Sequence, residues 1–184
     1  MLPDLHSRRF CIFGLQGSGK SFVARRILLS EPAHFVYDVM HEYQGCNRYL
    51  VRNRQYTPEA LAELDLLVNR VVIGSHKVRL FVMDEASRYC PNRRPLPESI
   101  GELNDLQRHY DVACGFIARR PVQLNTDLVE LSHYLFVFTL RGKNDLAYLD
   151  SLASGLADAV AGLEKYHFVV VDPQRHFSVH SPVS

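Results

Sequence analysis

The chain has 184 residues, room for one well-filled α/β core, and we predict a single domain over residues 1–184. Hydrophobic residues make up 47% of it, and no stretch offers the roughly 18 uninterrupted apolar residues of a membrane span, so the composition predicts a soluble protein without a membrane span. The formal net charge of +1 excludes a surface that is basic throughout, although a ring of subunits can still gather a few arginines on one lining.

The first part of the chain predicts a strand, a glycine-rich loop and a helix in succession. The residues before the strand are charged and lack an apolar run, which is unlike a signal peptide and predicts an intracellular protein. The apolar segment Arg9–Gly14 predicts a buried strand, and Ser18–Leu29 has the periodicity of a helix. A second strand is predicted at His34–Asp38.

The middle of the chain combines an irregular segment, a helix, a strand and a long loop. Tyr43–Gln55 is expected to be irregular and rich in arginine, and a helix then begins at Thr57, which can cap free backbone N–H groups. A third strand is predicted at Arg79–Asp84, because residues 80–83 are all apolar, as is typical of a central strand covered on both faces. Ser87–Pro97 contains three prolines and predicts a loop whose length favours a functional role.

The last part of the chain alternates helices and strands and ends in a hairpin. A helix is predicted to end near Arg108, and the further elements are strands at Val112–Ala118 and Tyr134–Leu140, helices at Leu124–Leu131 and Asn144–Leu163, and hairpin strands at Tyr166–Val171 and His176–Val179. The alternation predicts an α/β fold, with a mostly parallel central sheet, helices on both faces and a C-terminal hairpin.

The segment Gly14–Ser21 (GLQGSGKS) matches the phosphate-binding loop pattern in full and lies between a predicted strand and helix. Its glycines let backbone N–H groups face the phosphates, Lys20 adds positive charge, and the Ser21 hydroxyl ligates Mg²⁺. The sequence therefore predicts a P-loop NTPase domain that binds ATP and Mg²⁺. The expected nucleotide-binding residues are Gly14, Gln16, Gly17, Ser18, Gly19, Lys20, Ser21 and Phe22.

Two acidic residues, Asp84 and Glu85, follow the apolar third strand directly. Because the carboxyl ends of parallel strands meet at one edge of a sheet, we expect Asp84 to hold the Mg²⁺ through water. Glu85 is expected to orient or deprotonate the attacking water. The two motifs together predict ATP hydrolysis.

Cysteine and aromatic residues are assigned no chemistry. Tyr37 and Tyr43 are able to stack on an adenine, but a packing role is the simpler expectation. The cysteines lack the close spacing of a zinc site, and we expect idle thiols at all four: Cys11, Cys46, Cys90 and Cys114.

With these motifs the chain resembles the HerA and FtsK superfamily of DNA-pumping ATPases, most of all the genome-packaging ATPases of viruses with double jelly-roll capsid proteins. Asp38–Tyr43 (DVMHEY) is similar to the family segment of aspartate, histidine, glycine, glutamate and tyrosine, with the intervening residues in a different order. Ala118–Pro121 (ARRP) is similar to the family's glutamine, arginine, proline tripeptide at the end of the fourth strand. The resemblance extends from Phe10 to about Tyr148.

Two arginines take site roles from this resemblance. Arg108 resembles the arginine that the family offers to the nucleotide of a neighbouring subunit, and it ranks first for this role, before Arg119. Arg119 stands where the family usually has the glutamine that senses the terminal phosphate. Three alternatives stay open for it: contact with phosphate, action across the subunit interface, or sensing by a neighbour such as Asn125. For either arginine, a cap on a helix or an ion pair is an equally weighted alternative.

The resemblance implies a ring of subunits, hexameric in the family, that moves double-stranded DNA through its pore. It implies packaging of a viral genome with capsid vertex proteins as partners, in the host cell cytoplasm and at the virion vertex. Arg93 and Arg94 of the loop at residues 87–97 are the expected DNA contacts, with a stiff surface loop or a subunit contact as the alternative. Other open functions are a motor for conjugation, repair or chromosome movement, and a phage assembly or secretion ATPase that does not act on DNA.

Overall fold

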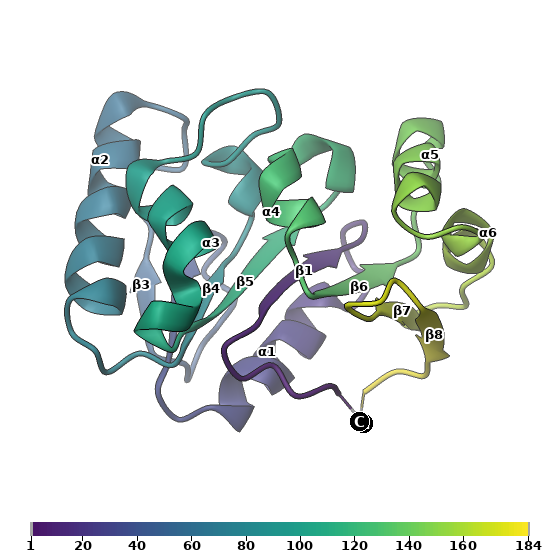
Figure 1. Cartoon of the computed structure of the whole chain (residues 1–184), viewed down its shortest axis with the longest axis horizontal. Helices are drawn as coiled ribbons and strands as arrows, with labels where there is room; N and C mark the ends of the chain where they lie inside the picture. Colours follow the sequence, from purple (N-terminus) through teal and green to yellow (C-terminus); the bar gives the residue numbers. More distant parts are fainter. Residues whose placement is uncertain (1, 184) are drawn as a thin grey trace.

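The computed structural model describes residues 2–183, which contain a single eight-stranded sheet. Its strands are β1 (Arg9–Phe13), β2 (His34–Asp38), β3 (Arg48–Leu50), β4 (Leu80–Met83), β5 (Ala113–Ala118), β6 (Tyr134–Phe138), β7 (Phe168–Val171) and β8 (Phe177–His180). Their order across the sheet is β3-β2-β4-β5-β1-β6-β7-β8 (Figure 1). The pairings from β3 to β6 are parallel, and β7 and β8 add two antiparallel pairings. The predicted parallel sheet and C-terminal hairpin are confirmed.

Helices cover the two faces of the sheet unequally (Figure 1). The α-helices are α1 (Lys20–Ser30), α2 (Pro58–Leu67), α3 (Glu98–Tyr110), α4 (Thr126–Glu130), α5 (Lys143–Leu152) and α6 (Leu156–Ala161). Short helical turns are the π-helix η1 (Val68–Ile73) and the 3-10 turns η2 (Ala86–Arg88) and η3 (Pro121–Gln123). The longest helix, α3, has 13 residues, and within residues 2–183 no helix is long and apolar enough to cross a membrane.

The two faces of the sheet have separate hydrophobic clusters. On one face, α1 buries Val23, Ala24, Ile27 and Leu28, whose spacing gives the helix one apolar side. On the other face, the remaining helices pack together, with Leu64 of α2 among the buried residues. The α1 face therefore depends on a single helix, whereas the other face has five.

Strand β4 is buried on both faces and places the acidic residue that follows it at the carboxyl edge of the sheet. All four of its residues are buried, because Leu80 and Val82 face the α1 cluster while Phe81 and Met83 face the other cluster. This confirms the prediction of a strand covered on both faces. The residue that follows, Asp84, is only 4% exposed and so enters the carboxyl edge of the sheet as a buried acid.

Two predictions about the elements were wrong. The segment Tyr43–Gln55, which was expected to be irregular, contains β3. This edge strand has only three residues and begins with Arg48, so no apolar run marks it in the sequence. The single helix expected at Asn144–Leu163 is divided into α5 and α6, because Ala153 is extended and Gly155 adopts φ 81°, a left-handed conformation that glycine favours.

Candidate nucleotide-binding site

The loop between β1 and α1 has a backbone that requires glycine. Gly17 (φ 73°) and Gly19 (φ 108°) are left-handed, and Gly19 lies just before the first residue of α1. A Cβ atom on Gly14 would lie 2.6 Å from both the Cβ of Phe138 and the Oγ of Ser18, so no larger residue fits without movement. The predicted strand, loop and helix are thus confirmed, and the loop opens at the N-terminus of α1, where backbone N–H groups attract anions.

Two side chains of the loop, Lys20 and Ser18, are placed in a way that suits a phosphate site. The Lys20 ammonium donates a hydrogen bond of 3.0 Å to the Leu15 carbonyl, and so lies over the loop. Burial lowers the pKa of Lys20, while the Glu85 and Asp84 carboxylates oppose this shift. The Ser18 hydroxyl is buried and has no hydrogen-bond partner within residues 2–183, which is the kind of group that a bound phosphate oxygen satisfies.

Asp84 is a buried acid close enough to the loop for its charge to act on Lys20. Burial, together with the neighbouring Glu85 carboxylate, raises its pKa to about 7, and a 3.3 Å hydrogen bond from the Met40 N–H opposes the shift. A buried carboxylate with several acidic neighbours is stabilised by a cation. The hard oxygens of Asp84 and of the Ser21 hydroxyl are of the type that Mg²⁺ prefers.

Glu85 is joined to Arg119 by an ion pair of 2.8 Å between Oε1 and Nε. The pair forms because β5 lies between β4 and β1, so the residue after β5 stands beside the residues after β4. Glu85 also adopts a left-handed backbone (φ 45°), which is uncommon for a residue other than glycine. The sequence singled out both residues but contained no signal that they are partners.

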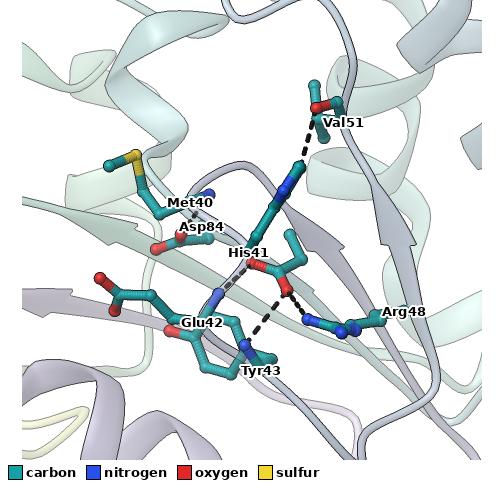
Figure 2. Close-up of polar contacts among 8 residues, drawn as sticks. Met40, His41, Glu42, Tyr43, Arg48, Val51 and Asp84 are labelled. Carbon is teal, nitrogen blue, oxygen red and sulfur yellow. Dashed lines mark hydrogen bonds and ion pairs between the residues drawn. The ribbon is translucent and has the colours of Figure 1, made fainter.

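Asp38 is a fully buried carboxylate that fixes the segment after β2. One of its oxygens accepts a 3.0 Å hydrogen bond from the Glu42 N–H, and the other accepts from the Tyr43 N–H at 3.1 Å and from the Arg48 guanidinium at 2.8 Å. Figure 2 shows this arrangement, in which Met40 and Asp84 lie next to the same turn. Asp38 is therefore a structural anchor for residues 39–43.

The anchored segment brings Glu42 to the phosphate-binding loop. The Ser21 hydroxyl donates a 2.6 Å hydrogen bond to Oε2 of Glu42. From the sequence, the segment Asp38–Tyr43 could be linked to the family, but no role was predicted for Glu42. Ser21 and Glu42 are 21 positions apart, so the sequence could not show that they are in contact. The position of Glu42 within the segment Asp38–Tyr43 was the only sequence feature that pointed to a role.

Arg108 lies away from this group of residues. It is at the end of α3, and its guanidinium is 3.3 Å from Nε2 of His133, just before β6 begins. The Arg9 N–H donates to Nδ1 of the same ring at 3.1 Å. A neutral imidazole then carries its proton on Nε2, so the contact with Arg108 joins two donors and is not a stabilising hydrogen bond. The structure does not bring Arg108 to the loop of its own chain, and a role toward a neighbouring subunit stays a prediction.

The loop at residues 87–97, which is irregular after the 3-10 turn η2, is anchored by hydrogen bonds. The Asn92 N–H donates to the Gln123 carbonyl at 2.9 Å, and the Asn125 amide donates to the Arg94 carbonyl at 2.9 Å. Arg93 and Arg94 are exposed, and Arg93 lines an open cavity of about 720 Å³. Asn125 also caps α4 through its side-chain oxygen, so its amide group is engaged in structure rather than directed to a phosphate.

The remaining candidates are buried. Tyr37 and Tyr43 are 0% exposed, so neither offers a ring face to an adenine, and the expected packing role is confirmed. Cys11, Cys90 and Cys114 are buried free thiols. Residues 2–183 contain no group of three or more His, Cys, Asp or Glu side chains placed to hold a metal ion by themselves.

Solved structures provide the likeness to known proteins. No protein-family model and no curated protein matches the sequence. The genome packaging NTPase B204 from Sulfolobus turreted icosahedral virus 2 matches with TM-scores of 0.80 in complex with AMP (18% identity, covering 100% of both chains) and 0.77 in complex with ATP-gammaS (17% identity, 97% of this chain and 98% of that chain). B204 of Sulfolobus turreted icosahedral virus, described as a DNA-packaging ATPase, matches at 0.78 (17% identity, 98% and 100%).

A second kind of protein shares the fold less closely. The N-terminal domain of zonular occludens toxin from Neisseria meningitidis matches with a TM-score of 0.59 and 13% identity, over 96% of this chain and 95% of that domain. At these identities the likeness establishes the fold alone. The chain has the P-loop NTPase fold of B204, and the predicted fold class is confirmed.

Proposed function

We propose that this protein is an ATPase that uses hydrolysis at the loop of residues 14–21 to package double-stranded DNA into a viral capsid. The observation that carries the proposal is the convergence of Glu42, Asp84, Glu85 and Arg119, from three different strand ends, on Lys20 and Ser21. The likeness to a genome packaging NTPase in complex with ATP-gammaS supports both the nucleotide and the process.

Binding of the triphosphate is assigned to the backbone of the loop and to the side chains of Lys20 and Ser21. The N–H groups at the start of α1 and the Lys20 ammonium meet the outer phosphates. Ser21 and Asp84 hold the Mg²⁺, which when bound supplies charge neutralisation on those phosphates. A triphosphate competes with the Leu15 carbonyl for Lys20 and gives the buried Ser18 hydroxyl a partner.

Hydrolysis is assigned to Glu85, with Arg119 as its partner. Glu85 holds and orients the attacking water as an ionised carboxylate. The Arg119 ion pair fixes the position of this carboxylate. A bound terminal phosphate is a second anion that can compete with Glu85 for the Arg119 guanidinium. Phosphate binding can therefore change the ion pair between Arg119 and Glu85.

The finer features of the motor follow from the resemblance to DNA-pumping ATPases. Subunits form a ring, a hexamer in that family, and Arg108 of one subunit completes the site of the next. Arg93 and Arg94 contact the DNA backbone, which makes binding independent of sequence and sensitive to salt. Anchoring falls to capsid vertex proteins in the host cell cytoplasm. The likeness to a genome packaging NTPase, with a TM-score of 0.80, supports the packaging assignment.

The test is ATP hydrolysis with and without long double-stranded DNA across a salt series. We expect DNA to stimulate hydrolysis, the stimulation to fade as salt rises, and the Arg93→Ala/Arg94→Ala variant to lose it while keeping its DNA-free rate. Arg26→Ala/Arg70→Ala, which removes two exposed arginines elsewhere, is the matched control. Hydrolysis that ignores DNA at every salt concentration would remove DNA from the proposal and leave the ATPase.

A further inference from the structure

An aromatic side chain lies beside the phosphate-binding loop on the surface. Tyr166 is 46% exposed, and its Cδ1 atom is 3.6 Å from the position that a Cβ on Gly19 would take. It belongs to the segment between α6 and β7 (Figure 1). Because β7 runs antiparallel to β6, this segment returns to the edge of the sheet where β6 ends and the loop begins.

The ring of Tyr166 continues a buried aromatic support under the loop. Phe138, the last residue of β6, lies 3.1 Å from the same Cβ position on Gly19, and its ring packs on Phe168 with 5.2 Å between the ring centres. Tyr166 itself adopts a left-handed backbone (φ 67°). The Lys165 ammonium lies 4.8 Å from the centre of the Tyr166 ring and so contacts one part of it, while the 46% exposure of the residue leaves ring surface open to a ligand.

The order of the strands fixes the direction in which a nucleotide would lie. Glu85 follows β4 and Arg119 follows β5, and both strands stand on one side of β1. Tyr166 precedes β7, which stands on the other side of β1. If the terminal phosphate meets the carboxylates, the nucleoside end of the molecule points toward β6 and β7, and so toward Tyr166.

We infer that Tyr166 is the platform on which the base of a bound nucleoside triphosphate stacks. The inference rests on the proposed nucleotide binding and names the part of the site that holds the base. The ring recognises the face of the base, and a flat aromatic surface accepts the face of any base. Tyr166 therefore contributes affinity for nucleoside triphosphates as a class and little preference among them.

The experiment compares ATP with inorganic tripolyphosphate, a ligand that keeps the phosphates and lacks the base. Isothermal titration with Mg²⁺ gives the two dissociation constants for the wild type and for Tyr166→Ala. The variant should bind ATP roughly 5- to 150-fold more weakly, which corresponds to the range measured for base–aromatic stacking, and should bind tripolyphosphate as the wild type does. Tyr166→Phe keeps the ring face and should restore ATP binding. Tyr56→Ala, at a tyrosine that is 43% exposed, is the matched control.

A spectroscopic measurement supplies a second readout. The chain has no tryptophan, so Tyr166→Trp introduces a single indole at this position. Stacking of a base on that indole should quench its emission when ATP is added, and tripolyphosphate should leave the emission unchanged.

Each other outcome overturns the inference in a recognisable way. Unchanged ATP affinity in Tyr166→Ala would show that the base rests elsewhere. An equal loss for both ligands would make Tyr166 a support for the loop and not a base platform. A wild type that binds neither ligand would overturn the proposed function as well, and Lys20→Ala, which should weaken both ligands, shows that the assay responds to phosphate binding.

Discussion

The Arg119 guanidinium donates to the Glu85 carboxylate across 2.8 Å, and that carboxylate is only 14% exposed. The proposed base of the reaction is thus held by an arginine of its own chain. This position resembles that of a phosphate-sensing glutamine, but a guanidinium adds a charge that a glutamine lacks. The pair connects the end of β5 to the end of β4, and any change at Arg119 must reach Glu85.

Removing Arg119 is expected to affect hydrolysis more than binding. Arg119→Ala should lower the single-turnover rate of ATP hydrolysis by about 10²-fold or more, because Glu85 loses its position and the phosphate loses a donor. Arg119→Lys keeps the charge without the planar fork and should recover part of the rate. Arg120→Ala is the contrast: it breaks the 2.8 Å pair with buried Asp145 and should lower the unfolding temperature. Normal turnover by Arg119→Ala would remove it from the mechanism.

Glu42 is expected to act through Ser21. Glu42→Gln leaves an oxygen that can accept from the Ser21 hydroxyl but removes the negative charge beside it, and should weaken ATP binding about 10- to 100-fold when Mg²⁺ is present, the loss typical of changes at the partners of metal ligands. Without Mg²⁺ the affinity should not fall. Titrations of ATP with Mg²⁺ and with a chelator distinguish the two conditions, and Glu130→Gln, an exposed acid of α4, is the control. An equal loss in both conditions would contradict this role.

Arg108 is expected to act on a neighbouring subunit. Arg108→Ala should bind ATP normally and hydrolyse it very slowly, because an arginine supplied in trans stabilises charge only during the reaction. Mixing Arg108→Ala with Lys20→Ala should restore some activity, since hybrid interfaces join an intact loop to an intact arginine. Hydrolysis rates over a range of mixing ratios provide the measurement. A mixture as inactive as its two components would argue against action in trans.

His133 predicts a dependence of stability on pH. Burial, together with nearby arginines that include Arg9 and Arg108, lowers the pKa of His133 to about 4. Between pH 6.5 and about 4 the unfolded chain therefore binds a proton that the folded chain does not, so the free energy of unfolding falls as the pH falls through this range.

His133→Asn should reduce this loss, because its amide oxygen can accept from the Arg9 N–H without titrating. The measurement is the difference in urea midpoint between neutral pH and about pH 4.5, with exposed His76→Asn as the control. An acid loss in His133→Asn as large as in the wild type would contradict the assignment.

The sequence predicted those parts of the site that are local in the chain. Gly14–Ser21 could be identified because a strand, a turn that requires glycine and a helix follow one another directly. Asp84 could be identified because the strand before it is apolar throughout. The contacts of Glu85 with Arg119 and of Ser21 with Glu42 could not, because they depend on which strands are neighbours.

The fold shows the same division. Periodicity revealed the sheet and hairpin, while β3 was missed because an edge strand of three residues has no apolar pattern. The break between α5 and α6 was missed because the helical spacing of apolar residues continues across it. Only the backbone conformations of Ala153 and Gly155 interrupt the helix. Tyr166 was assigned to a strand, and only its exposed position beside Gly19 indicates a binding role.

The measurement that tests the central claim most directly compares wild type and Glu85→Gln in two assays, ATP binding and steady-state ATP hydrolysis. Glutamine keeps the shape of Glu85 and an oxygen for Arg119 to donate to, but cannot take a proton. We expect the variant to bind ATP as tightly as the wild type and to hydrolyse it at a rate that is lower by about 10²-fold or more. Equal hydrolysis by the two proteins would contradict the assignment of Glu85 and of this edge of the sheet as a catalytic site.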